Sequence, residues 1–187
     1  MKKTSLILAL FSIISISAQT EWKLDKTHTS VRFEIGHMVI SDVEGKFSEF
    51  DGTISSSKND DFSDAEILFT INLKSVDTNN KKRDTHLQDA TFFNTEIYPN
   101  MTFKSTSVEK TSTKEYILKG NLTLRGITKE IVLKMTHNGT IKDPFGSVAR
   151  AGLKIEGELN REDFGIKYSK AMIGEKITIH CKTEITR

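Results

Sequence analysis

Apolar and polar residues alternate with a period of two along most of this chain, from Trp22 to the C-terminus. Such alternation places every second side chain on one face of a β-strand, so that one face is buried and the other meets solvent. The segment 30–35, with the sequence SVRFEI, is a short example. Helical periodicity is nearly absent outside one segment. The pattern therefore predicts an all-β fold.

The alternating segments number roughly eight or nine, which is the spacing expected of a β-sandwich or β-barrel. Within the second long segment the apolar phase changes between Phe47 and Phe50, which predicts a β-bulge there. The pair Arg125-Gly126 separates two segments and predicts a hairpin turn. Besides a short segment at Trp22, the predicted strands cover residues 31–35, 43–54, 67–73, 101–105, 116–124, 131–135, 149–159 and 177–185.

Residues 77–100 interrupt the alternation and are too many for a structureless loop inside a compact domain. We expect short helical structure there, with Thr78 and Asp89 as candidate N-caps. The apolar side chains of Leu87, Phe92 and Phe93 need a surface to cover, and they are candidates for a lid over the barrel.

The first 18 residues have the form of a secretory signal peptide: Lys2 and Lys3 precede an apolar run from Leu6 to Ile16, and small residues follow. We therefore predict a signal peptide over residues 1–18 and a single β-barrel domain over residues 19–187. Removal of residues 1–18 takes away two lysines and no acidic group, which lowers the formal net charge from +2 to zero. A neutral chain without a basic run is not expected to bind nucleic acid.

Cys181 is the only cysteine of the chain. An internal disulfide is therefore excluded, and a chain of this length has to form its own hydrophobic core. No cysteine lies near the predicted cleavage site to carry a lipid, so we expect no stable membrane anchor. The simplest localisation is the bacterial periplasm.

Several ordered motifs resemble the YceI family of exported, lipocalin-like polyisoprenoid-binding proteins. The resemblance begins with WKLDKTHTSVRFEIGHM at residues 22–38 and GKFSEFDGTI at residues 45–54. It continues through residues 75–106, which include Thr78, Arg83, Asp84, His86 and Pro99, and through GNLTLRGITKEIVL at residues 120–133. It ends in NREDFGI at residues 160–166.

The resemblance implies an antiparallel eight-stranded lipocalin-like barrel, with a short helical segment between strands and an apolar cavity for an isoprenoid chain. An eight-stranded barrel can also be filled by its own side chains, so the alternation alone does not decide between a cavity and a solid core. The inward-phase residues that we assign to ligand binding are Phe33, Ile35, Phe47, Phe69, Ile71, Phe103, Leu122, Leu124, Leu133, Met135, Leu153 and Ile155.

Small residues in the inward phase can be interpreted in two ways. Gly120, Ala149, Ala151 and Gly157 would leave room for a ligand inside the barrel. They are equally compatible with bulges or tight corners of the barrel wall.

Polar residues give no strong catalytic or metal-binding motif. The histidines are His28, His37, His86, His137 and His180, and none of them forms a metal-ligand spacing with another. Asp25 could orient His28 for acid–base chemistry, or the two could stabilise a turn. Arg83, Asp84 and His86 could meet a lipid headgroup at the barrel mouth, or an Arg/Asp pair could fix the helical segment to the rim.

We therefore predict a periplasmic protein that binds, carries or stores a polyisoprenoid, an isoprenoid quinone or a similar long-chain lipid, without a cofactor, a metal or an enzymatic activity. The alternatives are an enzyme acting on such a lipid and a ligand-free barrel used for protein interaction. The sequence leaves a homodimer open.

Overall fold

The computed structural model describes residues 19–144, 146 and 148–187, so the predicted signal peptide lies outside the described residues. The fold is built almost entirely from antiparallel strands. The strands are β1 (Thr20–His37), β2 (Ser41–Phe47), β3 (Phe50–Ser56), β4 (Glu66–Asn72), β5 (Val76–Asp77), β6 (Asn100–Lys110), β7 (Glu115–Leu124), β8 (Ile127–Lys142), β9 (Ala149–Asn160) and β10 (Ile173–Thr186). The helical elements are α1 (Lys81–Gln88) and the single 3₁₀ turns η1 (Leu73–Ser75) and η2 (Arg161–Phe164).

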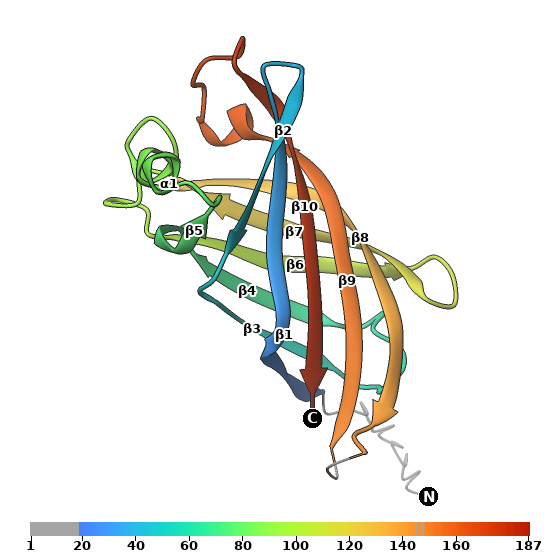
Figure 1. Cartoon of the computed structure of the whole chain (residues 1–187). Helices are drawn as coiled ribbons and strands as arrows, with labels where there is room; N and C mark the ends of the chain where they lie inside the picture. The colour runs from blue at the N-terminus through green and yellow to red at the C-terminus, as the bar shows by residue number, and fades with distance from the viewer. Residues whose placement is uncertain (1–18, 145, 147) are drawn as a thin grey trace, which may run out of the picture.

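The sheet closes into a barrel because its first and last strands, β1 and β10, pair with each other (Figure 1). Two pairs of short strands each act as one. β2 continues into β3, and β4 continues through η1 into β5; β3 pairs with β4, and β2 pairs with β5. Counted in this way the ring has eight antiparallel strands, which confirms the predicted all-β barrel with one short helix.

The break between β2 and β3 lies at Ser48 and Glu49, where the change of apolar phase predicted a bulge. The two residues are held by the neighbouring chain, since Ser48 N donates to Ser75 O at 3.2 Å and Asn72 N donates to Glu49 O at 2.9 Å. The interruption lets the two halves of the strand pair with different parts of β1.

One end of the barrel is closed by large side chains that are fully buried. Trp22 and Phe62 are in ring contact with centroids 5.7 Å apart, and the Tyr116 hydroxyl accepts from Phe62 N at 3.4 Å. Met135 pairs with Tyr116 across β7 and β8. The C-terminus lies at this end, and the β1–β2 hairpin projects from the opposite end (Figure 1).

Inward glycines do not leave empty space, because a side chain of a neighbouring strand covers them. A Cβ added at Gly120 would lie 2.3 Å from Phe103 Cζ, and one at Gly157 would lie 2.4 Å from Leu133 Cδ2. Phe33 covers Gly45 in the same manner. The interpretation of Gly120 and Gly157 as room for a ligand was therefore wrong. The glycines let large side chains lie flat against the wall, as in cross-strand aromatic–glycine pairs.

The segment between β5 and β6 contains the expected helix, but the helix begins later than the predicted cap. Asn80 is the N-cap, and its side chain accepts from Arg83 N at 3.1 Å. Asp89 is the C-cap rather than a second N-cap. Within the described residues, no helix combines the length and the apolar character needed to cross a bilayer.

Candidate ligand cavity

The barrel encloses a cavity of about 370 Å³ that opens toward α1 and the β1–β2 hairpin. A volume of this size is in the range of ligand pockets in proteins. Its wall is formed almost entirely by aliphatic and aromatic side chains. Ten of the twelve residues that the sequence assigned to ligand binding line it: Phe33, Ile35, Phe47, Phe69, Ile71, Phe103, Leu122, Leu124, Leu133 and Ile155.

The other two residues, Met135 and Leu153, do not line the cavity. Both are fully buried, and they belong to the packed closed end of the barrel. Leu153 pairs with His137, whose ring contacts Phe62 with centroids 5.0 Å apart. Both side chains point into the barrel, as the alternation predicted, but at this end of the barrel the interior is filled by other side chains.

The mouth of the cavity is covered by three rings, those of His86, Phe92 and Tyr168. The centroids of His86 and Phe92 are 4.9 Å apart, those of His86 and Tyr168 are 5.4 Å apart, and those of Phe92 and Tyr168 are 5.0 Å apart. We call these three residues the aromatic cover. It joins α1 and the segment after it to the loop before β10, two parts of the chain that are far apart in sequence.

The predicted lid residues Leu87, Phe92 and Phe93 all line the cavity. The Phe93 ring packs on Phe47 of β2, with centroids 6.0 Å apart. The turn that carries the phenylalanines is held from the other side by Arg125, whose Nη1 donates to Ala90 O at 2.8 Å and to Phe92 O. Arg125 therefore positions the cover without lining the cavity.

Arg83 and Asp84 do not form the pair with each other that the sequence suggested. Both bind Thr78 instead: Arg83 Nε donates to Thr78 Oγ1 at 2.7 Å, and Asp84 Oδ1 accepts from Thr78 Oγ1 at 2.6 Å and from Thr78 N at 2.9 Å. Asp84 lies outside the cavity wall, whereas Arg83 and His86 line it. Asp84 thus stabilises the start of α1, and only Arg83 and His86 remain candidates for meeting a headgroup.

Another arginine, Arg161, also lines the cavity and is only 1% exposed. Its guanidinium donates to three backbone carbonyls, those of Ile166, Ile173 and Gly174, at 2.5–3.0 Å. These acceptors are neutral, so they satisfy the hydrogen bonds and leave the positive charge in place. The ionisable side chains of the cavity wall are those of Arg32, His37, Arg83, His86, Tyr168, Arg161 and Cys181, and the wall includes no carboxylate among the described residues.

Sequence reasoning missed the contribution of the chain between β9 and β10 to this wall. Arg161 was part of the resemblance to YceI proteins but carried no assigned role, and Tyr168 and Met172 follow no alternation. Ile177 and Ile179 were in the inward phase of the last strand and could have been included. Cys181 lies beside them, and burial raises the pKa of its thiol to about 12, so that it is a neutral part of the wall.

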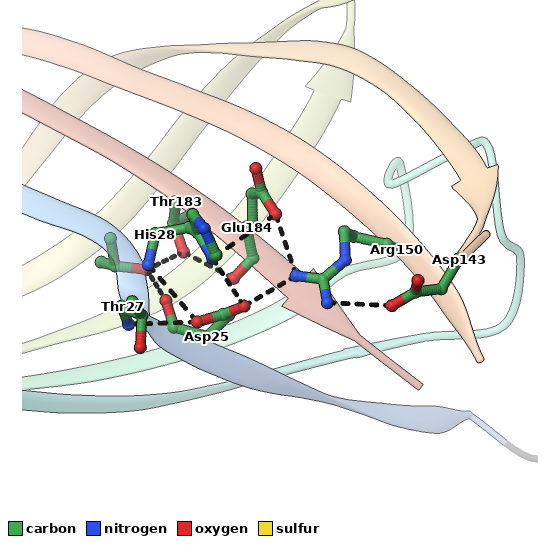
Figure 2. Close-up of polar contacts among 8 residues, drawn as sticks. Asp25, Thr27, His28, Asp143, Arg150, Thr183 and Glu184 are labelled. Carbon is green, nitrogen blue, oxygen red and sulfur yellow. Dashed lines mark hydrogen bonds and ion pairs between the residues drawn. The ribbon is translucent and has the colours of Figure 1, made fainter. Parts of the chain in front are cut away.

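A separate polar cluster lies at the pairing of β1 with β10, outside the cavity (Figure 2). Asp25 Oδ1 accepts from Thr27 N at 3.0 Å, while Asp25 Oδ2 lies 2.9 Å from His28 Nδ1 and 2.7 Å from Arg150 Nη1. Arg150 also donates to Glu184 at 2.9 Å and to Asp143 at 3.0 Å. Figure 2 shows the guanidinium between these carboxylates.

We call the pairing of β1 with β10 the seam. This cluster stabilises its irregular part, where the register shifts between Asp25 and Ser30. The hydrogen bond from His28, followed by that from Arg150, holds the pKa of Asp25 far below its usual range. The same carboxylate raises the pKa of His28 above 6.5. Of the two interpretations of Asp25 and His28, the geometry supports the stabilised turn.

Ligand atoms of Asp25, His28 and Glu184 lie within 4.8 Å of one another, which is close enough to share a metal ion. Arg150 already donates to both carboxylates, at 2.7 and 2.9 Å. A guanidinium in this position neutralises the carboxylates and repels a second cation. The arrangement is therefore that of a structural ion-pair network.

The remaining histidines are dispersed. His37 lines the cavity near its mouth, and His180 lies on the outer surface beside Glu156, with 3.3 Å between Nδ1 and Oε1. His137 is buried in the closed end, and its Nε2 lies 2.9 Å from Thr140 Oγ1. Burial lowers the pKa of His137.

Comparison with known proteins decides the family. A family model described as a YceI-like domain matches residues 22–185. The chain belongs to the YceI family. Among its YceI relatives, Protein YceI of Escherichia coli O157:H7 is 37% identical over 97% of both chains. Protein YceI of Salmonella newport (strain SL254) is 40% identical over 89% of this chain and 88% of the relative.

Solved structures confirm the YceI fold. The Campylobacter jejuni YCEI protein superposes with a TM-score of 0.74 at 32% identity, covering 90% of this chain and 98% of that chain. A polyisoprenoid binding domain from Saccharophagus degradans superposes with a TM-score of 0.66 at 14% identity, covering 88% of this chain and 97% of that chain. At 14% identity the second comparison shows a shared fold.

Proposed function

We propose that this YceI-family protein binds a long-chain isoprenoid-type lipid inside the barrel and carries or stores it in the periplasm. The observation that carries the proposal is the apolar cavity of about 370 Å³, which lies inside a barrel whose other end is packed solid. The resemblance in fold to a polyisoprenoid binding domain supports the same ligand class.

An apolar chain supplies the driving force in such a cavity. Each carbon group moved out of water contributes ~0.8 kcal/mol, so one five-carbon isoprene unit contributes about 4 kcal/mol before the costs of ordering the chain. Aromatic rings such as Phe33, Phe69 and Phe103 give the wall flat surfaces that accept the branched, unsaturated chain. No polar anchor is needed for binding, although one would fix the orientation of the lipid.

The polar end of the lipid is proposed to lie at the mouth, beside Arg83, His86 and Arg161. These groups donate hydrogen bonds or carry positive charge, and the wall around them includes no carboxylate among the described residues. A headgroup with acceptor oxygens, such as a quinone carbonyl or a phosphate, fits this environment. A cationic headgroup would be repelled.

We propose that the lipid is held without chemical change. The two polar groups that could have supported an enzyme, Asp25 and His28, lie outside the cavity in the seam cluster. Cys181 lines the cavity, but its thiol is protonated at neutral pH and is a poor nucleophile. If the protein were an enzyme, substitution of His86 or Arg83 would abolish turnover while lipid capture remained.

The test is mass spectrometry of protein exported to the periplasm and purified without detergent. Native and denaturing spectra are compared, and any released lipid is extracted and identified. A stoichiometric isoprenoid or isoprenoid quinone is the expected result. A mass equal to that of the polypeptide alone, persisting after incubation with such lipids, would contradict the proposal.

Leu122→Trp places a bulkier side chain in the cavity and is expected to lower the lipid occupancy. Leu68→Trp is the matched control, because Leu68 is half exposed on the outer surface of β4 and lies outside the cavity wall. Equal occupancy in the two variants would place the lipid elsewhere.

A further inference from the structure

The tip of the β1–β2 hairpin exposes three consecutive large apolar side chains, which we call the hydrophobic tip: Met38, Val39 and Ile40. Val39 is 100% exposed, Ile40 is 84% exposed and Met38 is 49% exposed. Single exposed apolar residues are ordinary on a protein surface, but three in a row on a projecting turn form a contiguous patch.

The backbone of the hydrophobic tip is unfavourable for these residue types. Ile40 N donates to His37 O at 3.2 Å, and the two central residues of the turn, Met38 and Val39, have φ angles of 52° and 63°. A turn with two positive φ angles normally contains Asn-Gly or Asp-Gly, and a β-branched residue in this region is an outlier. Apolar side chains are thus placed at the tip in spite of backbone strain, which points to a role for them in contact with another molecule.

The hydrophobic tip is continuous with the mouth of the lipid cavity. Met38 N donates to Met172 O at 2.8 Å, and His37 pairs with Ile173 at the end of the seam. Met172 and Tyr168 line the cavity and are also 46% and 38% exposed on the outside. In Figure 1 the hairpin and the loop before β10 project together from the end of the barrel opposite the C-terminus. The apolar wall therefore extends from the cavity to the exposed turn between β1 and β2.

The size of this surface argues against a protein partner. It offers five side chains on a convex point, whereas a stable protein interface uses about 20–30 residues on each side. A bilayer needs only a few apolar side chains to insert, because the surrounding lipid adapts to their shape.

Charge beside the hydrophobic tip is partly balanced. Lys170, in the adjacent loop, is paired with Glu162 at 2.7 Å and with Glu175 at 3.0 Å, so its charge is neutralised locally. Insertion of the tip would therefore be driven mainly by apolar contact, and the arginines of the cavity mouth would add attraction to an anionic lipid surface.

We infer that the hydrophobic tip inserts into the surface of a lipid bilayer and brings the cavity mouth against it, so that a lipid can pass between membrane and barrel along a continuous apolar path. The inference rests on the proposed function for its purpose, but the docking itself is a separate property of Met38, Val39, Ile40, Tyr168 and Met172.

The first experiment measures flotation of the purified protein with phosphatidylcholine vesicles, and a second series adds phosphatidylglycerol. We expect the wild-type protein to float in both series, and at least as strongly in the second. The variant M38N/V39G removes two apolar side chains and installs the residues that the turn geometry favours. It is expected to unfold at the same or a higher temperature and to bind vesicles about tenfold or more weakly. Weaker vesicle binding without a loss of stability excludes misfolding as the cause.

Two further variants complete the design. Ile141→Asn is the control for the loss of an exposed apolar side chain, because Ile141 is 59% exposed on β8 near the packed end of the barrel. This variant is expected to leave flotation unchanged. Val39→Trp places an indole at the tip, whose fluorescence should be quenched by brominated phosphatidylcholine. The native Trp22 is fully buried and gives an unquenched background.

Absence of flotation by the wild-type protein would overturn the inference, as would equal flotation of M38N/V39G. Concentration-dependent self-association that the M38N/V39G variant loses, without flotation, would assign the tip to a second copy of this chain instead. The vesicles contain no isoprenoid, so the result is independent of cavity binding. A protein that carries lipid but does not float disproves only the docking, and one that floats but holds no lipid disproves only the proposed function.

Discussion

Substitution of Gly120 by alanine tests whether the inward glycines exist to accommodate large neighbours. The added Cβ would lie 2.3 Å from Phe103 Cζ and 2.7 Å from the backbone oxygen of Lys104, so both a ring and a fixed strand would have to move. Overpacking of this kind costs ~1–3 kcal/mol, and the reduced freedom of the unfolded chain returns ~0.4–1 kcal/mol. We expect a net loss of about 1–2 kcal/mol, which lowers the Tm of a domain of this size by roughly 2–8 °C.

The control for this prediction is Gly152→Ala on β9. There the nearest atom to an added Cβ is Asn138 Cβ at 3.5 Å, which is an ordinary contact. This variant should be as stable as the wild type or more stable by up to ~1 kcal/mol. Thermal and urea unfolding of both variants give the comparison. If Gly120→Ala unfolds at the same temperature as Gly152→Ala or above it, the reasoning is refuted.

A second substitution separates the two sources of strain. Phe103→Leu in the Gly120→Ala background removes the ring contact and leaves the contact with the Lys104 carbonyl. The two substitutions should therefore show a favourable coupling energy of about 1 kcal/mol in a double-mutant cycle. The stability lost in Gly120→Ala should be recovered only in part. Because Phe103 lines the cavity, Gly120→Ala alone should also reduce lipid occupancy.

Three other predictions concern the seam, the cover and the thiol. In an NMR titration the pKa of His28 should lie above 6.5, and Asp25→Asn should lower it. The stability that protonated His28 contributes is present below pH 6.5 and is lost as the pH rises through the raised pKa. A wild-type pKa at or below 6.5 would disprove the ion pair. Arg125→Ala releases the turn that carries Phe92 and should speed lipid release by about fivefold or more, measured by transfer to acceptor vesicles. Cys181, whose pKa burial raises to about 12, should react with a charged disulfide reagent only after unfolding, and rapid reaction of the folded protein would contradict this.

The fold could be predicted from the sequence because buried and exposed side chains alternate at every second residue of a half-buried strand. The same periodicity located the interruption between Phe47 and Phe50, since a bulge shifts the phase of every following side chain. The cavity wall followed for a related reason: in a barrel the buried face and the cavity face are the same face.

Periodicity could not show how deep in the barrel a residue lies. Met135 and Ile155 are directly opposite each other on β8 and β9, yet only Ile155 lines the cavity. The difference depends on which side chains fill the closed end, and these come from distant parts of the chain. Coverage of Gly120 by the ring of Phe103 is likewise a contact between strands that a single-strand pattern does not contain.

The hydrophobic tip was hidden from the sequence for another reason. Met38, Val39 and Ile40 lie between the predicted strands 31–35 and 43–54, and they include none of the usual turn residues that would have marked a tight turn there. The positive φ angles of Met38 and Val39 are imposed by the pairing of β1 with β2 on either side.

Pairing of β1 with β10 joins the first strand of the domain to the last, for example Lys23 to Thr186. Contacts between such distant parts of a chain form slowly. A polypeptide that emerges N-terminus first therefore remains an open sheet, with an unpaired edge along β1, until residues 173–186 are available. The interior exists only after the final strand has docked, so a nascent chain has no enclosed site, and loading follows folding.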